Sequence, residues 1–497
     1  MLRACIALIV AALALPAQAK DPIVITMQDV VPLRGFPNIY IDWVSSRYLP
    51  ALFDALTEVA EGGAIRPALA TGWRAKDPLT WEFDLREGVS FSNGEPFNAD
   101  AVIQAIAFLQ SDEAVSFPIR RHVRNIAVVE RLTDHKIVIR TMRPDAMLPA
   151  RMRTVRMVPP KYFTAVGRVG FAKMPHGTGP FMAQKMERTR TVLVVNPNAW
   201  RKPQWDELHF VPVGDAIART QAVISGAADI AFNTGPSIAE AIEGAGARLL
   251  AYDIGSVDAV PFVTTMDTPL KDKRVRQALN YAVNKAPLIA AFVHGATSPA
   301  TQFAPLGTFG YTANLPPAYA YDPAKAKALL KDAGYPNGFE TAIELWTDGT
   351  EQAAIHQQII SDLAAVDVSV RIIQVPILQW QNEGLYGGKW EAPMFNFAYN
   401  AMPTFDALEA LETHSCLWVK PFNCDRAMAD KIVEARETSD REVRLAKTRA
   451  LFAALLEDPA AILLFPSIRF DVAGARMLPY AAPFGLLRFQ DLAKRPK

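Results

Sequence analysis

The stretch "WEFDLREGVSFSNGEPFNADAV", from Trp81 to Val102, decides the fold because it contains a strand, a turn and a helix start in quick succession. Its first letters alternate apolar and charged side chains, which predicts a strand with one buried face. Asn93 and Gly94 tolerate positive φ and predict a turn, and Asn98 is placed to cap a helix. Backbone geometry explains the residues required in this stretch, because it contains no nucleophile–base pair and no metal-ligand cluster.

Similar patterns continue along the chain and alternate strands with helices. We expect strands at 134–140, 190–196, 341–346 and 368–375 and helices at 272–293, 321–334 and 351–366. In the second of these helices Asp322 is the expected cap, Pro323 suits the first turn and Gly334 suits the stop. This alternation predicts an α/β fold. With 497 residues the chain is too long for one core, and the absence of a long polar linker predicts lobes joined by short ordered crossings.

The first 19 residues have the features of a secretory signal peptide. Arg3 precedes an apolar run, and Ala17-Gln18-Ala19 supplies a cleavage pattern before Lys20. The alternative, a membrane anchor, needs about 20 apolar residues, and this run is shorter. We therefore expect an exported, soluble chain that begins at residue 20.

The charge balance excludes a strongly basic surface. The sequence has 52 Lys and Arg residues against 51 Asp and Glu residues, and removal of Arg3 with the signal makes these numbers equal. We expect no binding to nucleic acid or to anionic lipid.

Two cysteines, Cys416 and Cys424, remain after signal cleavage, and they lie close together in "CLWVKPFNC". In an oxidising compartment such a pair favours a disulfide, which would fasten a local loop by roughly 2 to 3 kcal/mol. The alternative is two buried, reduced thiols.

Signatures of catalysis and of cofactor binding are missing. The sequence has no G-x-S-x-G elbow, no Walker loop and no H-E-x-x-H pair, and its seven histidines are scattered. "HGTGPFM", from His176 to Met182, lacks the third glycine of a dinucleotide loop and predicts a turn before a strand. We therefore expect no enzyme activity, no metal site and no cofactor.

Aromatic and amide residues concentrate in the second half, in "ELWTDG", "ILQWQNEGLYGGKW" and "MFNFAYNAMPTF". Such residues suit a pocket that holds a polar solute by stacking and hydrogen bonding. Ordinary core strands are the alternative for each of them.

Four motifs in order resemble the landmarks of the family 5 extracellular solute-binding proteins, the periplasmic components of peptide, nickel and opine ABC importers. These are the segment 52–102, "GTGPF" with "VLVVNPNAW", "DKRVRQALNYAVNKAPLI" and "DPAKAKALLKDAGYPNG". The resemblance implies a two-lobed periplasmic binding protein fold (class II, cluster C type) with an extra subdomain in the first lobe. It also implies a periplasmic monomer that captures a small polar solute in an interlobe cleft and delivers it to the permease subunits at the inner membrane.

On this resemblance residues 1–19 are the signal peptide and 20–258 form lobe I, with the subdomain at about 60–172. Residues 259–467 form lobe II, and 468–497 return to lobe I. The predicted crossings make a hinge beside the cleft.

The resemblance also assigns site residues. We expect Trp380 and Tyr399 as stacking surfaces, Trp346 as a wall and Asn400 as a neutral replacement for the aspartate that binds the peptide amine in dipeptide-binding relatives. No arginine follows Trp346 to pair with a peptide carboxylate. A buried dipeptide would leave both termini unpaired, so we expect a modified peptide, an opine or another less charged solute instead. A secreted hydrolase, or a receptor or chaperone on the same scaffold, is the alternative function.

Overall fold

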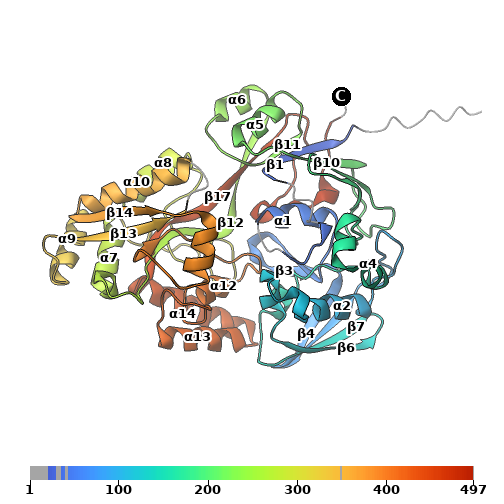
Figure 1. Ribbon diagram of the computed structural model, residues 1–497, viewed down its shortest axis with the longest axis horizontal. Coiled ribbons are helices and arrows are strands. Elements are labelled where there is room, and N and C mark those ends of the chain that lie inside the picture. Colours follow the sequence, from blue (N-terminus) through green and yellow to red (C-terminus); the bar gives the residue numbers. More distant parts are fainter. Residues whose placement is uncertain (1–20, 30–34, 40–42, 347–349, 496–497) are drawn as a thin grey trace, which may run out of the picture.

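The computed structural model describes residues 21–29, 35–39, 43–346 and 350–495, so the predicted signal peptide lies outside the described residues. Figure 1 shows two groups of elements joined by two long strands, β12 (Arg248–Pro261) and β17 (Ala461–Ala473). We call the group with both chain ends lobe I and the other lobe II. None of the helices in the described ranges has the length and apolar character of a membrane span.

An eight-stranded mixed sheet organises lobe I, in the order β16-β12-β17-β11-β1-β10-β9-β8. Its central strand β1 pairs in parallel with β10 and β11, and β12 pairs antiparallel with β17. The other strands are β1 (Ile23–Met27), β8 (Phe181–Met186), β9 (Thr191–Val195), β10 (Glu207–Pro212), β11 (Ile230–Thr234) and β16 (Tyr399–Asn400). The helices of this lobe are α1 (Trp43–Tyr48), α3 (Leu148–Arg151), α4 (Pro160–Lys173), α5 (Ala216–Ile224) and α6 (Ala239–Gly244).

The opening stretch forms part of a subdomain with its own core. Four antiparallel strands in the order β4-β5-β7-β6 pack against α2 (Ala99–Gln110). The predicted local features are confirmed, because Gly94 has φ +87° and Asn98 Oδ1 accepts a hydrogen bond from the backbone N–H of Asp100 at 3.0 Å. The strands are β4 (Ala70–Asp77), β5 (Thr80–Leu85), β6 (Ile126–Thr133) and β7 (Lys136–Thr141), and a separate hairpin joins β2 (Thr57–Val59) to β3 (Ile65–Pro67).

Lobe II contains a parallel three-stranded sheet, in the order β14-β13-β15, and most of the remaining helices (Figure 1). The strands are β13 (Phe339–Leu345), β14 (Val368–Gln374) and β15 (Met394–Phe395). The helices are α7 (Lys273–Ala282), α8 (Lys285–Phe292), α9 (Pro323–Asp332), α10 (Thr350–Ala364), α11 (Ile377–Gln379), α12 (Leu408–Thr413), α13 (Arg426–Glu437) and α14 (Arg441–Glu457). The predicted cap of α9 is confirmed, since Asp322 accepts a hydrogen bond from the N–H of Lys325 at 2.9 Å.

The prediction of one helix over 272–293 is wrong. The backbone is extended at Val283 and Asn284, which separates α7 from α8. Pro287 has no N–H to donate to the carbonyl of Val283, so it cannot continue α7 but fits the first turn of α8. The N–H of Asn284 instead donates to the Asp362 carboxylate at 2.9 Å.

The strands β12 and β17 contribute to the cores of both lobes. Ile462 and Leu464 of β17 lie in the core that α7 and β13 cover, whereas Ala473 lies in the core around β1. The boundaries predicted near residues 258 and 467 fall inside these two strands. A pair of strands anchored at both ends is a suitable place for a hinge, and the hinge stays a prediction.

The disulfide between Cys416 and Cys424 is present, so the predicted pairing is confirmed. It closes a short loop between α12 and α13, and the indole N–H of Trp418 inside that loop donates to the Leu385 carbonyl at 2.8 Å. The covalent bond and the hydrogen bond together fix the loop against lobe II.

Candidate functional site

The structure places two of the predicted site residues, Trp346 and Trp380, in one aromatic cluster of lobe II, whereas Tyr399 belongs to another core cluster. Trp380 is 3% exposed, and its ring centroid lies 5.8 Å from that of Trp346 and 5.4 Å from that of Phe397. Trp346 is only partly buried, and Asn396 bonds to both its backbone N–H and its carbonyl. In this arrangement Trp346 has a face near the surface, whereas Trp380 packs inside the lobe.

Tyr399 lies deeper still, with no exposed surface. Its ring stacks on His414 with 3.7 Å between centroids, and the His414 Nδ1–H donates to the Ala410 carbonyl at 2.8 Å. Burial lowers the pKa of His414 to about 3, so its imidazole is neutral at physiological pH. Burial also raises the pKa of the Tyr399 phenol far above its usual value. The pair forms an uncharged, tightly packed part of the lobe II core.

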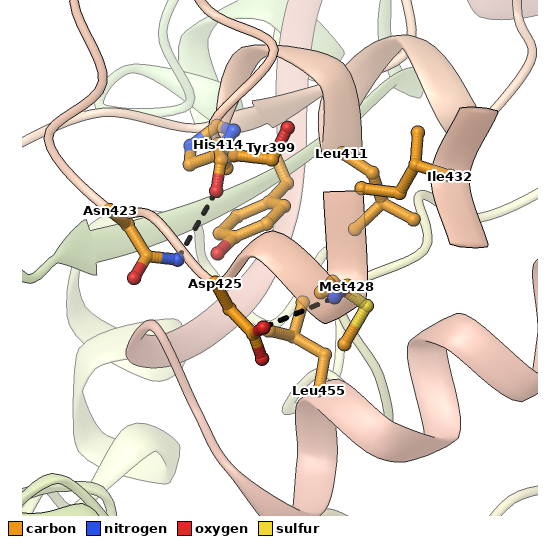
Figure 2. A pocket seen from close by; sticks show the side chains of 9 residues that line it. Tyr399, Leu411, His414, Asn423, Asp425, Met428, Ile432 and Leu455 are labelled. Carbon is orange, nitrogen blue, oxygen red and sulfur yellow. Dashed lines mark hydrogen bonds between the residues drawn. The ribbon is translucent and has the colours of Figure 1, made fainter. Parts of the chain in front are cut away.

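A small cavity adjoins this pair, and Figure 2 shows the side chains that line it. Its volume of about 20 Å³ has room for one water molecule and none for a solute. Asn423 Nδ2 donates to the His414 carbonyl at 3.2 Å, and Asp425 accepts from the Met428 N–H at 3.1 Å, as Figure 2 shows. The polar groups here serve the local backbone.

Asn400 is exposed on β16, directly opposite Ser256 of β12. Its Oδ1 atom accepts a hydrogen bond from the Met402 N–H at 2.8 Å. Its Nδ2 group has no partner among the described residues, so this end of the amide remains available as a donor.

The two lobes meet beside Asn400, in a cluster that we call the lobe junction: Val59, Met402, Phe405, Phe484 and Leu486. Phe405 of lobe II stacks obliquely on Phe484 of the C-terminal return, with 4.2 Å between ring centroids. Gly255 of β12 has φ +71°, and a Cβ there would lie 2.9 Å from the Phe405 ring. Glycine is therefore required where the crossing strand passes the junction.

Arg153 of lobe I reaches this junction, and the charge of Arg156 acts on it from the same segment. Arg153 is 6% exposed, donates to the Pro403 carbonyl and places its guanidinium carbon 4.9 Å from the centre of the Phe405 ring. Arg156 donates to the Phe53 carbonyl at 3.3 Å. Within the described ranges neither guanidinium lies within 4.0 Å of a carboxylate. Burial, reinforced by their mutual repulsion, lowers the pKa of Arg153 to about 9, and burial lowers that of Arg156 to about 10.

The carboxylates near these arginines already have partners. Asp54 pairs with Arg201 and also accepts hydrogen bonds from Thr178 and from the indole of Trp200, both at 2.9 Å. Glu58 pairs with Arg201 and with Arg66, again at 2.9 Å each. Arg153 and Arg156 therefore have no ion-pair partner of their own among the described residues, and the attraction of Asp54 and Glu58 does not offset the desolvation of these guanidiniums, which suits an anionic group from outside the chain.

A larger cavity, of about 370 Å³, lies against the crossing strands. It is lined by residues 251–253 and 257 of β12, residues 466 and 468 of β17, and residues 296–302, 304, 306 and 311 of lobe II. Its volume is in the range of small-molecule sites. Among the described residues Asp253 is the only carboxylate that lines it.

The subdomain also contacts lobe II through buried charges. Arg121 pairs with Glu409 of α12 at 2.7 Å and donates through Nε to His122 Nε2 at 3.2 Å. His122 Nδ1 lies 3.0 Å from the Thr154 hydroxyl, and burial lowers the pKa of His122 to about 4. The histidine is therefore neutral and accepts from the arginine. The two lobes thus contact each other at a polar patch as well as at the apolar junction.

Sequence reasoning did not identify Arg153, Arg156 or Asp253. The arginines stand in "RMRTVRMV", where basic residues alternate with apolar ones, and this pattern of charge inside an apolar segment was a usable signal. Asp253 has no comparable signal, because most residues that line the cavity with it come from distant parts of the chain.

The glycines of "HGTGPFM" have a structural role. A Cβ at Gly177 would lie 2.0 Å from the Leu52 carbonyl oxygen, and the Gly179 N–H donates to that oxygen at 3.0 Å. The predicted turn before a strand is confirmed, since β8 begins at Phe181. Among the residues that the structure describes, no group of three or more His, Cys, Asp or Glu side chains is placed to hold a metal ion.

Comparison with known proteins agrees with this architecture. The nickel-binding periplasmic protein of Escherichia coli K12 is 28% identical over 444 residues, 82% of each chain. The glutathione-binding protein GsiB of the same organism is 27% identical over 444 residues, 85% of this chain and 84% of that one. These relatives are solute-binding proteins.

The solved structure of the ABC transporter substrate-binding protein CtaP from Listeria monocytogenes superposes with a TM-score of 0.84 at 18% identity, covering 96% of this chain and 100% of that one. This likeness supports the two-lobed binding-protein fold. Residues 64–416 match the model described as "Bacterial extracellular solute-binding proteins, family 5 Middle". The chain therefore belongs to the family 5 extracellular solute-binding proteins, the substrate-binding components of ABC importers.

Proposed function

We propose that this protein captures a small solute with at least one carboxylate at the lobe junction, where Arg153 and Arg156 bind that carboxylate. The observation that carries the proposal is the pair of guanidiniums without a carboxylate partner in the described ranges, beside Asp54 and Glu58 that are already paired. A planar guanidinium matches a carboxylate with two parallel hydrogen bonds, so an arginine pair favours this group over a neutral one.

The position of Arg153 links binding to both lobes. Its guanidinium comes from lobe I, yet it contacts Pro403 and Phe405 of lobe II. A carboxylate that neutralises Arg153 therefore lies where the lobes meet. Binding there would stabilise the arrangement in which the lobes touch, because a ligand favours the state to which it binds more tightly.

The four site residues that the sequence predicts remain part of this proposal. Asn400 borders the junction with a free amide donor, and Trp346 has a partly exposed ring. We propose that Asn400 donates to the solute, that Trp346 forms a wall, and that Trp380 and Tyr399 support this wall from inside lobe II.

We further propose that the protein works in the periplasm as a monomer and delivers its solute to permease subunits in the inner membrane, without catalysing a reaction. The names of the two E. coli relatives support the binding role: one is a nickel-binding periplasmic protein and the other a glutathione-binding protein. Cell fractionation and N-terminal sequencing test the location and the cleavage after Ala19.

A thermal-shift screen with carboxylate solutes and their uncharged amides tests the carboxylate assignment. A carboxylate at 100 times its dissociation constant should stabilise the folded protein by about 2.7 kcal/mol, and its amide should give no comparable shift. Stabilisation by both members of each pair would contradict the role of the arginines.

Arg153→Gln provides a second test with two readouts. It removes an unpaired buried charge, so it should raise the stability of the empty protein while it weakens carboxylate binding. Arg140→Gln is the matched control, because Arg140 pairs with Glu130 on the surface of the subdomain and should change neither property by more than a few tenths of a kcal/mol. A loss of both stability and binding in Arg153→Gln would indicate a structural role instead.

A further inference from the structure

Helix α12 of lobe II faces the subdomain of lobe I where the two lobes meet (Figure 1). The carboxylate of Glu409 on this helix pairs with Arg121 of the subdomain at 2.7 Å. Glu412, three residues further along the helix, lies 3.8 Å from Arg151 at the end of α3. Positions i and i+3 lie on the same side of a helix, so both glutamates meet arginines that the other lobe supplies.

The two contacts differ in what remains when the lobes separate. Arg151 and Glu412 each lie closer to a partner in their own lobe, which is Asp145 at 3.2 Å and Arg436 at 3.3 Å. The side chain of Glu409 is only 6% exposed, and in the described ranges no lysine or arginine of lobe II lies within 4.0 Å of it. The close cation of Glu409 therefore comes from the other lobe.

The carboxylate of Glu409 stays ionised in this contact. Burial acts to raise its pKa, but the charge of Arg121, the contact with His122 and the charge of Arg151 outweigh burial and hold the pKa well below its usual value. A buried carboxylate that loses its cation is strongly destabilised, because it is desolvated without compensation. Separation of the lobes would return it to water instead.

An apolar side chain lies in the same contact. Met147 of lobe I is 1% exposed and belongs to the buried cluster of lobe II that contains Ala407 and Leu411. The backbone beside it is also bonded across the lobes, since the Ala146 N–H donates to the Arg436 carbonyl at 3.0 Å. The contact thus combines an apolar anchor with complementary charges, as interfaces between separate proteins do. Interfaces of this kind within one chain permit relative motion of the parts.

We propose that the Arg121–Glu409 pair is a latch that stabilises the closed arrangement of the lobes, so that these two positioning residues determine how long a captured solute is retained. Neither side chain has to contact the solute. The pair favours closure, whereas burial of Arg153 opposes it, so the empty protein is a mixture in which the latch sets the closed fraction. Retention rests on the proposed function, but closure through this pair does not.

A purely structural role for the pair predicts a different result. If the subdomain and lobe II never separate, only the unfolded chain solvates Arg121 and Glu409, and loss of the pair lowers the free energy of unfolding in full. If they do separate, the open folded protein solvates both groups. The loss of stability then cannot exceed the free energy of opening, while the closed fraction falls.

The test measures the distance between two spin labels in the empty mature protein by double electron–electron resonance. The labels are attached at Glu87→Cys in the subdomain and Asp430→Cys on α13, both of which are exposed positions, and the native cysteines stay in their disulfide. We expect a minor short distance from the closed arrangement and a longer one from the open arrangement. Glu409→Gln should lower the ratio of closed to open protein by about tenfold or more, since a hydrogen bond to a charged group corresponds to about 10- to 100-fold in an equilibrium constant.

Reversal of the pair tests whether charge is responsible. Arg121→Glu alone should abolish the short distance, because it places two carboxylates together, and Arg121→Glu with Glu409→Arg should restore it. Glu130→Gln is the matched control, because Glu130 pairs with Arg140 inside the subdomain at 3.2 Å. It should leave both distances and their ratio unchanged.

Equal distance distributions in the parent and in Glu409→Gln would overturn the latch, whether both proteins are closed or both are open. A lower melting temperature without opening would also overturn it and indicate the structural role. For the carboxylate with the largest thermal shift, dissociation from Glu409→Gln should be about tenfold faster, and an unchanged rate would overturn the role in retention. If no carboxylate gives a thermal shift, the proposed function fails, and the distances still decide the latch.

Discussion

Acid should destabilise lobe II through His414, which burial keeps neutral. The pKa of this histidine falls from 6.5 to about 3 on folding. Below pH 6.5 the unfolded chain therefore binds a proton that the folded chain does not, so stability falls as the pH is lowered through this window. Each pH unit lowers the free energy of unfolding by about 1.4 kcal/mol, so the fall from pH 6.5 to pH 5 lowers it by about 2 kcal/mol.

Urea unfolding followed by tryptophan fluorescence between pH 5 and pH 8 measures this loss, because Trp346, Trp380 and Trp390 share an aromatic cluster of lobe II with Phe422, which packs on His414. His414→Phe keeps an aromatic ring against Tyr399 and cannot be protonated. This variant should lose the hydrogen bond to Ala410 at every pH, yet its stability should fall by about 2 kcal/mol less than that of the parent between pH 8 and pH 5.

The exposed His294 provides the control, and His294→Asn should keep the full pH dependence of the parent. Burial of His122 should cause a similar loss of stability in acid at the contact between the lobes. Part of the pH dependence of the parent should therefore remain in His414→Phe. An unchanged pH profile in His414→Phe would refute the claim that this imidazole stays neutral because it is buried.

Three further predictions concern single residues. Asn400→Asp should weaken binding of the carboxylate solute by a few kcal/mol, because it replaces an amide donor with a negative charge at the junction. Calorimetry measures this change, and unchanged affinity would show that Asn400 does not contact the solute. Gly177→Ala should lower the melting temperature by several degrees because its Cβ meets the Leu52 carbonyl, whereas Gly72→Ala, with open space around it, should not; equal melting temperatures would show that the backbone adjusts. Free dipeptides should give no saturable thermal shift, because the sequence has no arginine after Trp346 and has Asn400 at the position expected for the amine-binding aspartate; a saturable shift with dipeptides would refute this argument.

Much of the fold could be predicted because its signals are local. The strand, turn and capped helix around Asn98, the cap of α9 at Asp322 and the disulfide all depend on residues close in sequence. The break between α7 and α8 shows the limit of this reasoning, because apolar spacing continues through a segment that Pro287 interrupts. Local backbone chemistry there overrides periodicity.

The candidate site was harder to predict because its charges become unusual only in three dimensions. Arg153 differs from a surface arginine because it is buried with no ion-pair partner in the part of the chain that the structure describes, and neither composition nor spacing predicts that. The aromatic residues show the opposite case. Trp380 and Tyr399 have the composition of a binding pocket, yet they stack on Phe397 and His414 inside lobe II. Aromatic content alone does not separate a pocket wall from a core.

The unpaired charge of Arg153 also bears on why the empty protein would not adopt the closed conformation of the solute-bound protein. When the lobes touch without a solute, Arg153 remains buried beside Phe405 with no ion-pair partner among the described residues. Arg153 would regain water if the lobes separated, so the empty closed arrangement carries a desolvation cost that an anionic solute removes. A solute can shift the equilibrium only by its differential affinity for the two states, and here that difference comes from the groups that closure buries. Neutralising this charge by Arg153→Gln should therefore favour the closed arrangement in the absence of any solute, measured as a smaller radius of gyration in X-ray scattering. An unchanged or larger radius would show that this charge does not control closure.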